Sequence, residues 1–139
     1  MKQILPLILI GLTSSLIASD RDREIVAATL ILEAGGEYVD GALEAVHEVI
    51  QNRAVNRRMT KAEVCLQRWQ FSCWNNRSID DGIRKAKTHP RWNEALRITY
   101  IYTNYTNGAD HYHAHYVRPY WADLMTVTAI IGNHIFYKQ

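Results

Sequence analysis

The hydrophobic pattern of this chain changes its period once, near Asn107-Gly108, and that change most constrains the fold. Before it, apolar residues recur at helical spacing, whereas residues 111–116 alternate histidine with other residues, a two-residue repeat typical of a strand. Two β-prone runs, 127–131 and 134–137, are separated by Gly132-Asn133, which suits a hairpin turn of type I′ or II′. The sequence therefore predicts an α+β fold with a helical N-terminal half and a small antiparallel sheet or hairpin in the C-terminal half.

Capping residues and periodicity place the helices of the N-terminal half. A first helix is expected from Asp20 or Asp22 to Glu33, and a second from about 41 to 57, capped by Asp40. Further helices are expected from Thr60, where Thr60 and Glu63 fit a capping box, and from Pro90 to about Thr103. The segment 69–78 is aromatic, polar and without periodicity, so we expect a loop that lines a site.

The N-terminal residues have the order of a secretory signal, with Lys2, an apolar run from Ile4 to about Leu12 and then small polar residues. The apolar run is shorter than the roughly 20 residues of a stable membrane span. We therefore expect residues 1–19 to be an export signal, with a short anchor as the alternative, and residues 20–139 to form one domain. The protein is then expected in the periplasm, in the cell envelope or outside the cell, with no other membrane span.

Charge and cysteine content narrow the function further. The formal net charge is only +2 and the basic residues are scattered, so no coherent face for nucleic acid is expected. Cys65 and Cys73 are too far apart for a C-x-x-C redox or zinc motif. In an exported domain they are expected to form a disulfide that holds the loop between them.

The run Glu24 to Glu37 contains the strongest catalytic candidate. An apolar helix delivers Glu33 onto a turn with paired glycines, and burial there disfavours the charged form of a carboxylate, so Glu33 can serve as a general acid. The alternative is an ordinary helix end, in which Gly35 or Gly36 supplies a left-handed capping residue. Glu37 either faces the same site or hydrogen-bonds the turn, and the second role is favoured.

These elements resemble, in their order along the chain, the cell wall hydrolase family typified by the spore cortex-lytic enzyme of sporulating bacteria. The resemblance covers about residues 24–138. It is carried by E-A-x-G-E at 33–37, the stretch 45–53 ending in Gln-Asn-Arg, Q-F-S-C-W at 70–74, the strand with Tyr112, P-x-W at 119–121 and I-G-N-H-I-F-Y at 131–137.

The resemblance implies a lysozyme-like domain that cleaves the glycan strand of peptidoglycan between N-acetylmuramic acid and N-acetylglucosamine, with Glu33 as the catalytic acid. Because only one acid is clearly placed, a lytic transglycosylase is favoured over a muramidase that uses water. No cofactor is expected, and the protein is expected to act as a monomer.

A glycan site needs aromatic platforms and hydrogen-bonding side chains, and the C-terminal half supplies both. Tyr116 and Tyr120 are further aromatic candidates, although many aromatic residues of a small domain belong to its core. The substrate-binding residues expected from the sequence are Glu37, Gln70, Phe71, Trp74, Tyr112, His113, Trp121 and His134.

Two other functions remain open from the sequence. His111, His113 and His115 share one face of the predicted strand, so with His134 they could bind zinc in a peptidoglycan amidase or peptidase. No H-E-x-x-H motif supports that function, and the interpretation without metal is favoured. The second alternative is a wall-binding module that uses the aromatic residues and has no catalytic acid.

Overall fold

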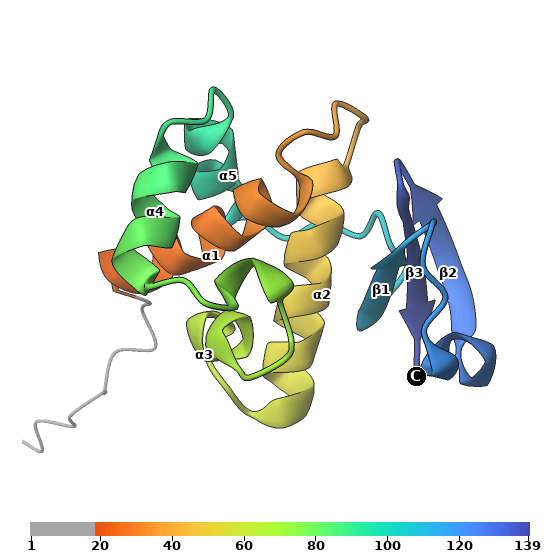
Figure 1. The fold of residues 1–139 in the computed structure, drawn as a ribbon. Coiled ribbons are helices and arrows are strands. Elements are labelled where there is room, and N and C mark those ends of the chain that lie inside the picture. Colours follow the sequence, from red (N-terminus) through yellow and green to blue (C-terminus); the bar gives the residue numbers. More distant parts are fainter. Residues whose placement is uncertain (1–18) are drawn as a thin grey trace, which may run out of the picture.

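The computed structural model describes residues 19–139, in which five α-helices precede a three-stranded sheet (Figure 1). The predicted α+β class is therefore confirmed. The export signal predicted at residues 1–19 lies outside the described residues except for Ser19. In chain order the elements are α1 (Asp20–Ala34), α2 (Ala42–Arg57), α3 (Lys61–Leu66), the 3-10 helix η1 (Ser72–Trp74), α4 (Ile79–Lys87), α5 (Trp92–Ile98), β1 (His111–Ala114), the 3-10 helix η2 (Tyr120–Leu124), β2 (Thr126–Ile131) and β3 (His134–Lys138).

Helix α1 is the centre of the helical half. It contacts α2, α3, α4 and α5, and all its residues from Ile25 to Ile31 are buried. A helix that is apolar on every side is stable only when other helices surround it. Its N-terminal cap is Ser19, whose Oγ accepts a hydrogen bond from Asp22 N, so the expected caps Asp20 and Asp22 lie inside the first turn.

The beginnings of α2 and α3 differ in their caps. Asp40 does not cap α2, because the chain enters that helix through Gly41 at φ 79° without a side-chain cap. A Cβ at Gly41 would lie 2.4 Å from the ring of Tyr105, so glycine is required there for space and conformation. The capping box of α3 is confirmed, since the side chains of Thr60 and Glu63 each accept the other's backbone N–H.

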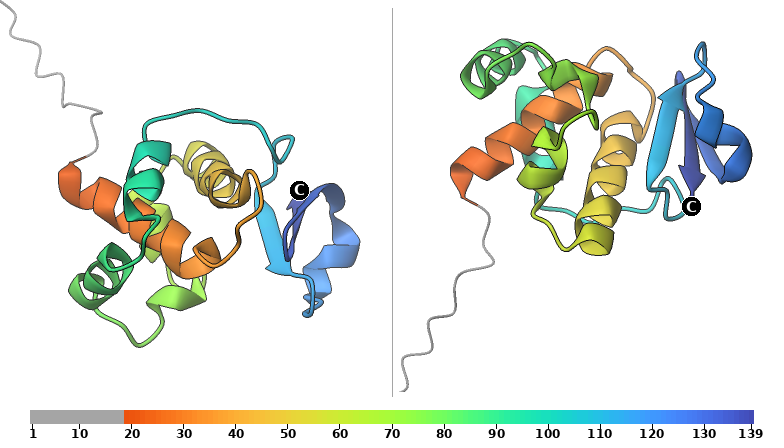
Figure 2. Two further views of the ribbon diagram at one scale, coloured as in Figure 1. Left: turned by 90° about the horizontal axis from the view of Figure 1, so that it is seen from above. Right: turned by 60° about the horizontal axis from the view of Figure 1, so that its bottom comes forward.

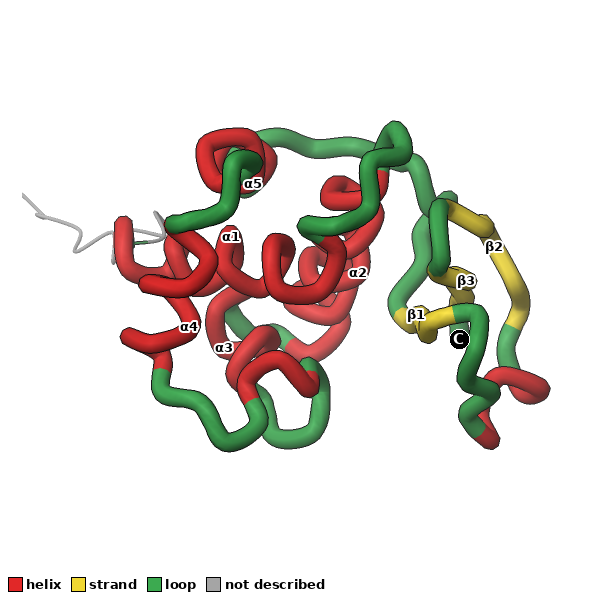
Figure 3. Tube along the Cα trace, turned by 45° about the horizontal axis from the view of Figure 1, so that its top comes forward, coloured by secondary structure: helices red, strands yellow, loops and turns green. Residues whose placement is uncertain are grey.

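The prediction from the sequence did not include one helix and made another helix too long. Helix α4 follows its cap Ser78 and buries Gly82, Ile83 and Ala86, in a segment for which no element was expected. Helix α5 ends at Ile98, although the apolar pattern continued to Thr103. The residues after α5 leave the helical half and run to β1 as a long connection that passes behind α2 in the orientation of Figure 1 (Figures 2 and 3).

The antiparallel sheet has the order β1-β3-β2, with β3 in the middle. Tyr112 pairs with Phe136 and His113 with Ile135, and a bulge interrupts the β2–β3 pairing between Val127 and Ala129. Within the predicted hairpin turn only Gly132 has a positive φ, of 57°, which fits the type II′ alternative.

Helix α2 belongs to two hydrophobic cores. One side packs in the helical core with α1, and the other side packs on the sheet through Ala45 and Val49, which join Ala109 and Phe136. Figure 1 shows α2 standing between α1 and β1. The interface between helices and sheet therefore lies along α2.

The predicted disulfide is absent, because Cys65 and Cys73 are free thiols. Cys65 is buried in the helical core, and Cys73 packs against that core from η1. Burial, as the largest cause, raises the pKa of Cys65 to about 12, and it also raises the pKa of Cys73. Both thiols are thus held in the protonated form, which is a poor nucleophile for forming a disulfide.

No helix within residues 19–139 is both long enough and apolar enough to cross a membrane.

Candidate active site

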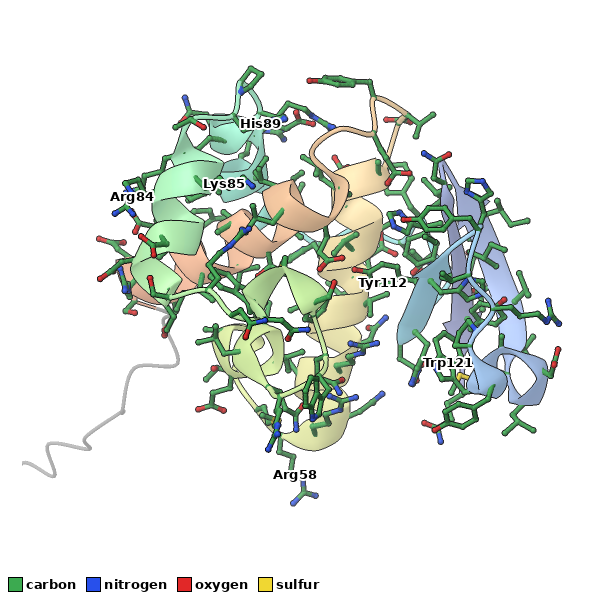
Figure 4. All side chains as sticks on the ribbon, in the orientation of Figure 1. Arg58, Arg84, Lys85, His89, Tyr112 and Trp121 are labelled. Carbon is green, nitrogen blue, oxygen red and sulfur yellow. The ribbon has the colours of Figure 1, made fainter. Side chains whose placement is uncertain are left out.

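Glu33 and Tyr112 meet at the interface between the helices and the sheet. Glu33 is the last residue but one of α1, and Tyr112 lies in the middle of β1, between α2 and the sheet in Figure 4. The Tyr112 hydroxyl donates a hydrogen bond of 2.9 Å to Glu33 Oε2. Burial first, and then the charge of Glu33 and the hydrogen bond to it, raise the pKa of Tyr112 well above its ordinary value. The phenol therefore stays protonated and remains a donor to Glu33.

The other oxygen of Glu33 has a different environment. Glu33 Oε1 is buried and has no hydrogen-bond partner within the described part of the chain. Cys73 is a close neighbour, since the charge of Glu33 contributes, after burial, to the raised pKa of the Cys73 thiol. The Tyr112 phenol thus holds one oxygen of this carboxyl, and the Cys73 thiol, whose pKa a hydrogen bond to Glu33 also raises, is a further neighbouring donor.

Glu37 is tied to the hairpin turn on the other side of the interface. Its Oε2 lies 2.7 Å from His134 Nδ1, and its Oε1 accepts the backbone N–H of Asn133. A Cβ at Gly132 would lie 2.7 Å from Glu37 Oε1, so glycine at this turn leaves room for the carboxylate. The side chains of Glu37 and His134 are only 11% and 12% exposed. The Glu37 carboxylate thus contacts the hairpin turn at 132–133, and not the Gly-Gly turn that was expected as its partner.

The two acids are connected through aromatic rings. The His134 ring meets the Tyr112 ring edge-on at a centroid distance of 5.0 Å, and Tyr112 also stacks on Phe136 at 5.4 Å. Movement of the hairpin turn would therefore move Tyr112 and, with it, the hydrogen bond to Glu33.

The backbone of the Gly-Gly turn is held by Arg91, a residue that sequence reasoning did not single out. Arg91 Nη1 donates to the carbonyl oxygen of Glu37 at 2.7 Å, and its guanidinium pairs with Glu94. The glycines of this turn do not supply a left-handed cap, because Gly35 has φ −59° and Gly36 is not among the positive-φ glycines. The turn is thus shaped by contacts from the segment before α5.

The segment 70–74 contributes one residue directly beside Tyr112. Phe71 is buried, and its ring centroid lies 6.4 Å from that of Tyr112. Gln70 instead accepts a hydrogen bond from Arg57 at its Oε1. Trp74 lies on the helical core, where its Nε1 donates to Thr29 Oγ1, so it does not join the other candidates.

The histidines of β1 lie on the opposite face of the sheet from Glu33. His113 is buried against Tyr137, with its Nε2 2.7 Å from the Tyr137 hydroxyl, and Trp121 covers this face at 5.7 Å from the His113 ring. Trp121 and Tyr112 occupy different faces in Figure 4. The substrate-binding roles predicted for His113 and Trp121 are therefore not supported by their positions.

The four histidines considered for zinc do not converge. His111 contacts Asp110, His115 contacts the Asn133 carbonyl, and His134 contacts Glu37 on the other face. Within residues 19–139, no three His, Cys, Asp or Glu side chains are grouped so that they could hold a metal ion.

The surface also has a hollow of about 690 Å³ at the far end of α1 from Glu33. Asp22 and Val26 of α1 line it together with Arg58 and Lys61. It contains none of the acid and aromatic residues that meet at Tyr112. We therefore place the candidate active site at Glu33 and not at this hollow.

Sequence reasoning also missed Glu48, which is 5% exposed in the middle of α2. Its carboxylate accepts hydrogen bonds from the Thr103 hydroxyl, the Tyr105 N–H and both the N–H and hydroxyl of Thr106. A glutamate on a buried helix face is the signal that could have found it. Its role is to hold the connection that leads into β1, and so to position Tyr112.

Comparison with known proteins gave a family match. The model of a family described as Cell Wall Hydrolase matches residues 36–137, well over half of the chain. The matched range includes Glu37, Phe71, Tyr112 and His134 and begins three residues after Glu33. No curated protein and no solved structure matches.

Proposed function

The chain belongs to the cell wall hydrolase family, and from this premise we propose that it cleaves peptidoglycan glycan strands between N-acetylmuramic acid and N-acetylglucosamine. The membership itself supports an enzyme that degrades peptidoglycan. The observation that carries the finer proposal is the contact between Glu33 and Tyr112, which orients a half-buried carboxyl at the interface between the helices and the sheet.

The reaction needs one acid that acts twice. Glu33 gives its proton to the glycosidic oxygen while the bond from that oxygen to C1 of the muramic acid breaks. The C6 hydroxyl of the same sugar then bonds to C1, and its proton goes to the Glu33 carboxylate. The products are a free C4 hydroxyl on N-acetylglucosamine and a 1,6-anhydromuramic end, so Glu33 recovers its proton and no water is consumed.

The environment of Glu37 supports this single-acid mechanism over hydrolysis. A hydrolytic glycosidase uses two carboxyl groups that flank the bond. Glu37 is the nearest second acid along the chain, and its two oxygens face His134 and the Asn133 N–H. Its carboxylate is thus directed at the hairpin turn, with Oε1 bound to the Asn133 N–H and Oε2 buried beside His134 without a hydrogen bond from the described residues.

Tyr112 contributes by orienting the acid. Its hydrogen bond fixes one oxygen of Glu33, and the packing of its ring between His134 and Phe71 fixes the phenol. Positioning of this kind adds to the roughly 10² to 10⁴ in rate that general acid–base catalysis supplies.

Mass spectrometry of the soluble products from purified peptidoglycan tests the proposal. We expect anhydromuropeptides from the protein and none above background from Glu33→Gln. Glu24→Gln is the matched control, because Glu24 lies on the same helix and only pairs with Lys87 at the surface. Reducing-end muropeptides would instead establish a muramidase, and freed stem peptides would exclude glycan cleavage.

Action on the wall also requires that the protein reach it. We propose export through the signal at residues 1–19, for which the supporting observation is the order of charged, apolar and small polar residues. Fractionation of producing cells, with sequencing of the mature N-terminus, checks this expectation.

A further inference from the structure

Arg53 is a buried cation in which one guanidinium nitrogen has no partner in the described part of the chain. The residue is 7% exposed, and its Nε donates a 2.7 Å hydrogen bond to the Asp110 carbonyl. Its Nη1 is buried and has no hydrogen-bond partner among residues 19–139. Burial is the largest cause of the lowered pKa of Arg53, yet a guanidinium stays charged in proteins. A buried charge without a partner is costly, so this site is incomplete as it stands.

A second cation, Arg57, lies one helical turn further along α2. Its Nη1 donates to Gln67 Oε1 at 2.6 Å and to Gln70 Oε1 at 2.8 Å, both neutral acceptors. The charge of Arg57 lowers the pKa of Arg53, as expected for neighbouring like charges. Like charges four residues apart destabilise a helix. Arg53 and Arg57, which we call the arginine pair, therefore concentrate positive charge at the end of α2.

No carboxylate of the described chain forms an ion pair with the arginine pair. The charge of Asp110 raises the pKa of Arg53, but this effect is smaller than the lowering of the pKa by burial. Asp110 Oδ1 already contacts His111 Nδ1 at 2.9 Å and accepts the N–H of Gln139 at 3.1 Å. The positive charge is thus left for a ligand from outside the chain.

The arginine pair adjoins the candidate active site. The Arg53 guanidinium lies over the Phe71 ring, with Cζ 5.5 Å from the centroid, and Phe71 neighbours Tyr112. Tyr112 in turn donates to Glu33 and feels the charge of Arg53. Two aromatic rings therefore separate the unpartnered guanidinium from the catalytic acid, on the same side of β1.

We propose that Arg53 and Arg57 form a subsite that binds a carboxylate carried by the muramic acid substituent of the substrate. A guanidinium fork matches a carboxylate in two parallel hydrogen bonds, which fixes orientation as well as adding affinity. The proposal rests on the proposed function, since it assigns this charge to the same bound glycan. The carboxylate comes from the stem peptide or from the lactyl group itself when no peptide is attached.

Binding of soluble disaccharides to the Glu33→Gln protein tests the subsite without cleavage. The probes are a disaccharide with its acidic stem peptide, the same molecule with every carboxylate converted to an amide, and the disaccharide with a bare lactyl carboxylate. We expect amide formation to weaken binding about tenfold or more, because each lost charge-assisted hydrogen bond is strong. Tight binding of the bare lactyl compound would assign that carboxylate, and weak binding would assign the stem peptide.

Equal binding of the acidic and amidated probes would overturn the subsite and leave glycan cleavage standing. Cleavage of peptidoglycan into anhydromuropeptides by the unchanged protein, measured beside it, keeps the two proposals separate. If no probe binds and no glycan is cleaved, the proposed function fails and the subsite fails with it.

Variants of the arginine pair test which residues bind the carboxylate of the probe. Arg57→Gln in the Glu33→Gln background is expected to remove most of the preference for the acidic probe. Arg53→Gln should do the same, but it also loses the bond to Asp110, so Arg57→Gln decides if that variant does not fold. Arg58→Gln is the control, because Arg58 is exposed at the end of α2 and points away from the sheet in Figure 4. Equal preferences in Arg57→Gln and Arg58→Gln would overturn the assignment.

Discussion

At the scale of single residues, Tyr112 joins more of the candidate site than any acid does. Its hydroxyl donates a hydrogen bond to Glu33, and its ring contacts the rings of His134, Phe71 and Phe136. His134 in turn contacts Glu37. The phenol is therefore the point at which the hairpin turn and the end of α1 act on each other.

Removal of the Tyr112 hydroxyl should separate catalysis from packing. Tyr112→Phe keeps the ring contacts but loses the hydrogen bond to Glu33, so turnover on peptidoglycan should fall about ten- to a hundredfold. Tyr137→Phe is the matched control, because it loses a phenol contact to His113 on the other face of the sheet. Release of soluble anhydromuropeptides measures both. Equal losses in the two variants would contradict the role of Tyr112.

His47 makes the stability of the fold depend on pH. It is 1% exposed in α2, and burial first, then the charge of Lys61, lower its pKa from 6.5 to about 3. Lys61 Nζ lies 3.0 Å from His47 Nε2, so the neutral ring accepts from the ammonium. The unfolded chain takes up the proton first, and the stability present above pH 6.5 is therefore lost as the pH falls toward 3.

Acidification should accordingly destabilise the protein before its carboxylates titrate. Between pH 7 and pH 5 the free energy of unfolding should fall by about 2 kcal/mol from His47 alone. Urea denaturation at several pH values measures the slope. His47→Gln should flatten it, because an amide does not titrate, and an unchanged slope in that variant would contradict the assignment.

At the scale of elements, the candidate site depends on helices packed at close range. The clearest example is the contact of α4 with η1, where Gly82 lies against the ring of Trp74. Trp74 also donates to Thr29 in α1, so η1 is held between two helices. This arrangement fixes the position of the adjacent Cys73 and Phe71.

Gly82→Ala should loosen that contact. A Cβ at Gly82 would lie 2.3 Å from a ring carbon of Trp74, so the ring or the helix must shift. We expect a loss of about 1 to 3 kcal/mol in the free energy of unfolding. Gly36→Ala is the control, because a Cβ there meets nothing within 4 Å. Thermal unfolding compares the two, and equal melting temperatures would contradict this prediction.

The same contact explains which elements could be predicted from the sequence. The first two helices, the capping box of α3 and the hairpin turn carry strong local signals, and the structure confirms them. Helix α4 is short, and its buried side consists of Gly82, Ile83 and Ala86, so only one large apolar residue marks that side in the sequence. The connection after α5 is held by Glu48 at Thr106, which is a contact between distant residues that no local pattern records.

The candidate site was predictable to a similar extent. Glu33, Glu37, Phe71, Tyr112 and His134 come together, as the motifs indicated. The alternation of residues along the strand predicted correctly which side chains share a face with His113. It could not predict which face of the sheet packs against the helices. The role of Arg53 was missed because an arginine on a helix shows neither its burial nor its lack of partners until the helix is packed.

At the scale of the whole molecule, the helices and the sheet are held together along α2. The shared core of Ala45, Val49 and Phe136 is small, and polar contacts supplement it. Asn52 donates to the Ala109 carbonyl at 2.8 Å, and Glu48 holds the connection at Thr103 to Thr106. The position of β1 relative to α1 therefore depends on side chains of α2 that bind backbone.

Glu48→Gln should weaken the attachment of the sheet to the helices. An amide can accept with only one oxygen, and its NH₂ group would face donors, so the free energy of unfolding should fall by about 3 kcal/mol. Hydrogen exchange should quicken at the amides of Tyr105 and Thr106, which donate to Glu48. Glu44→Gln, a partly exposed position in the first turn of the same helix, is the control. Unchanged exchange at these two amides would contradict the proposed role of Glu48.

The hydrogen bond from Tyr112 to Glu33 joins residues 79 positions apart. A ribosome makes the acid early and its partner late, so a nascent or truncated chain carries Glu33 without the group that orients it. If Glu33 is the catalytic acid that we propose, the site is complete only after β1 has been synthesised and docked on α2. For the proposed activity against a cell wall, this order of synthesis delays cleavage until the sheet has been made.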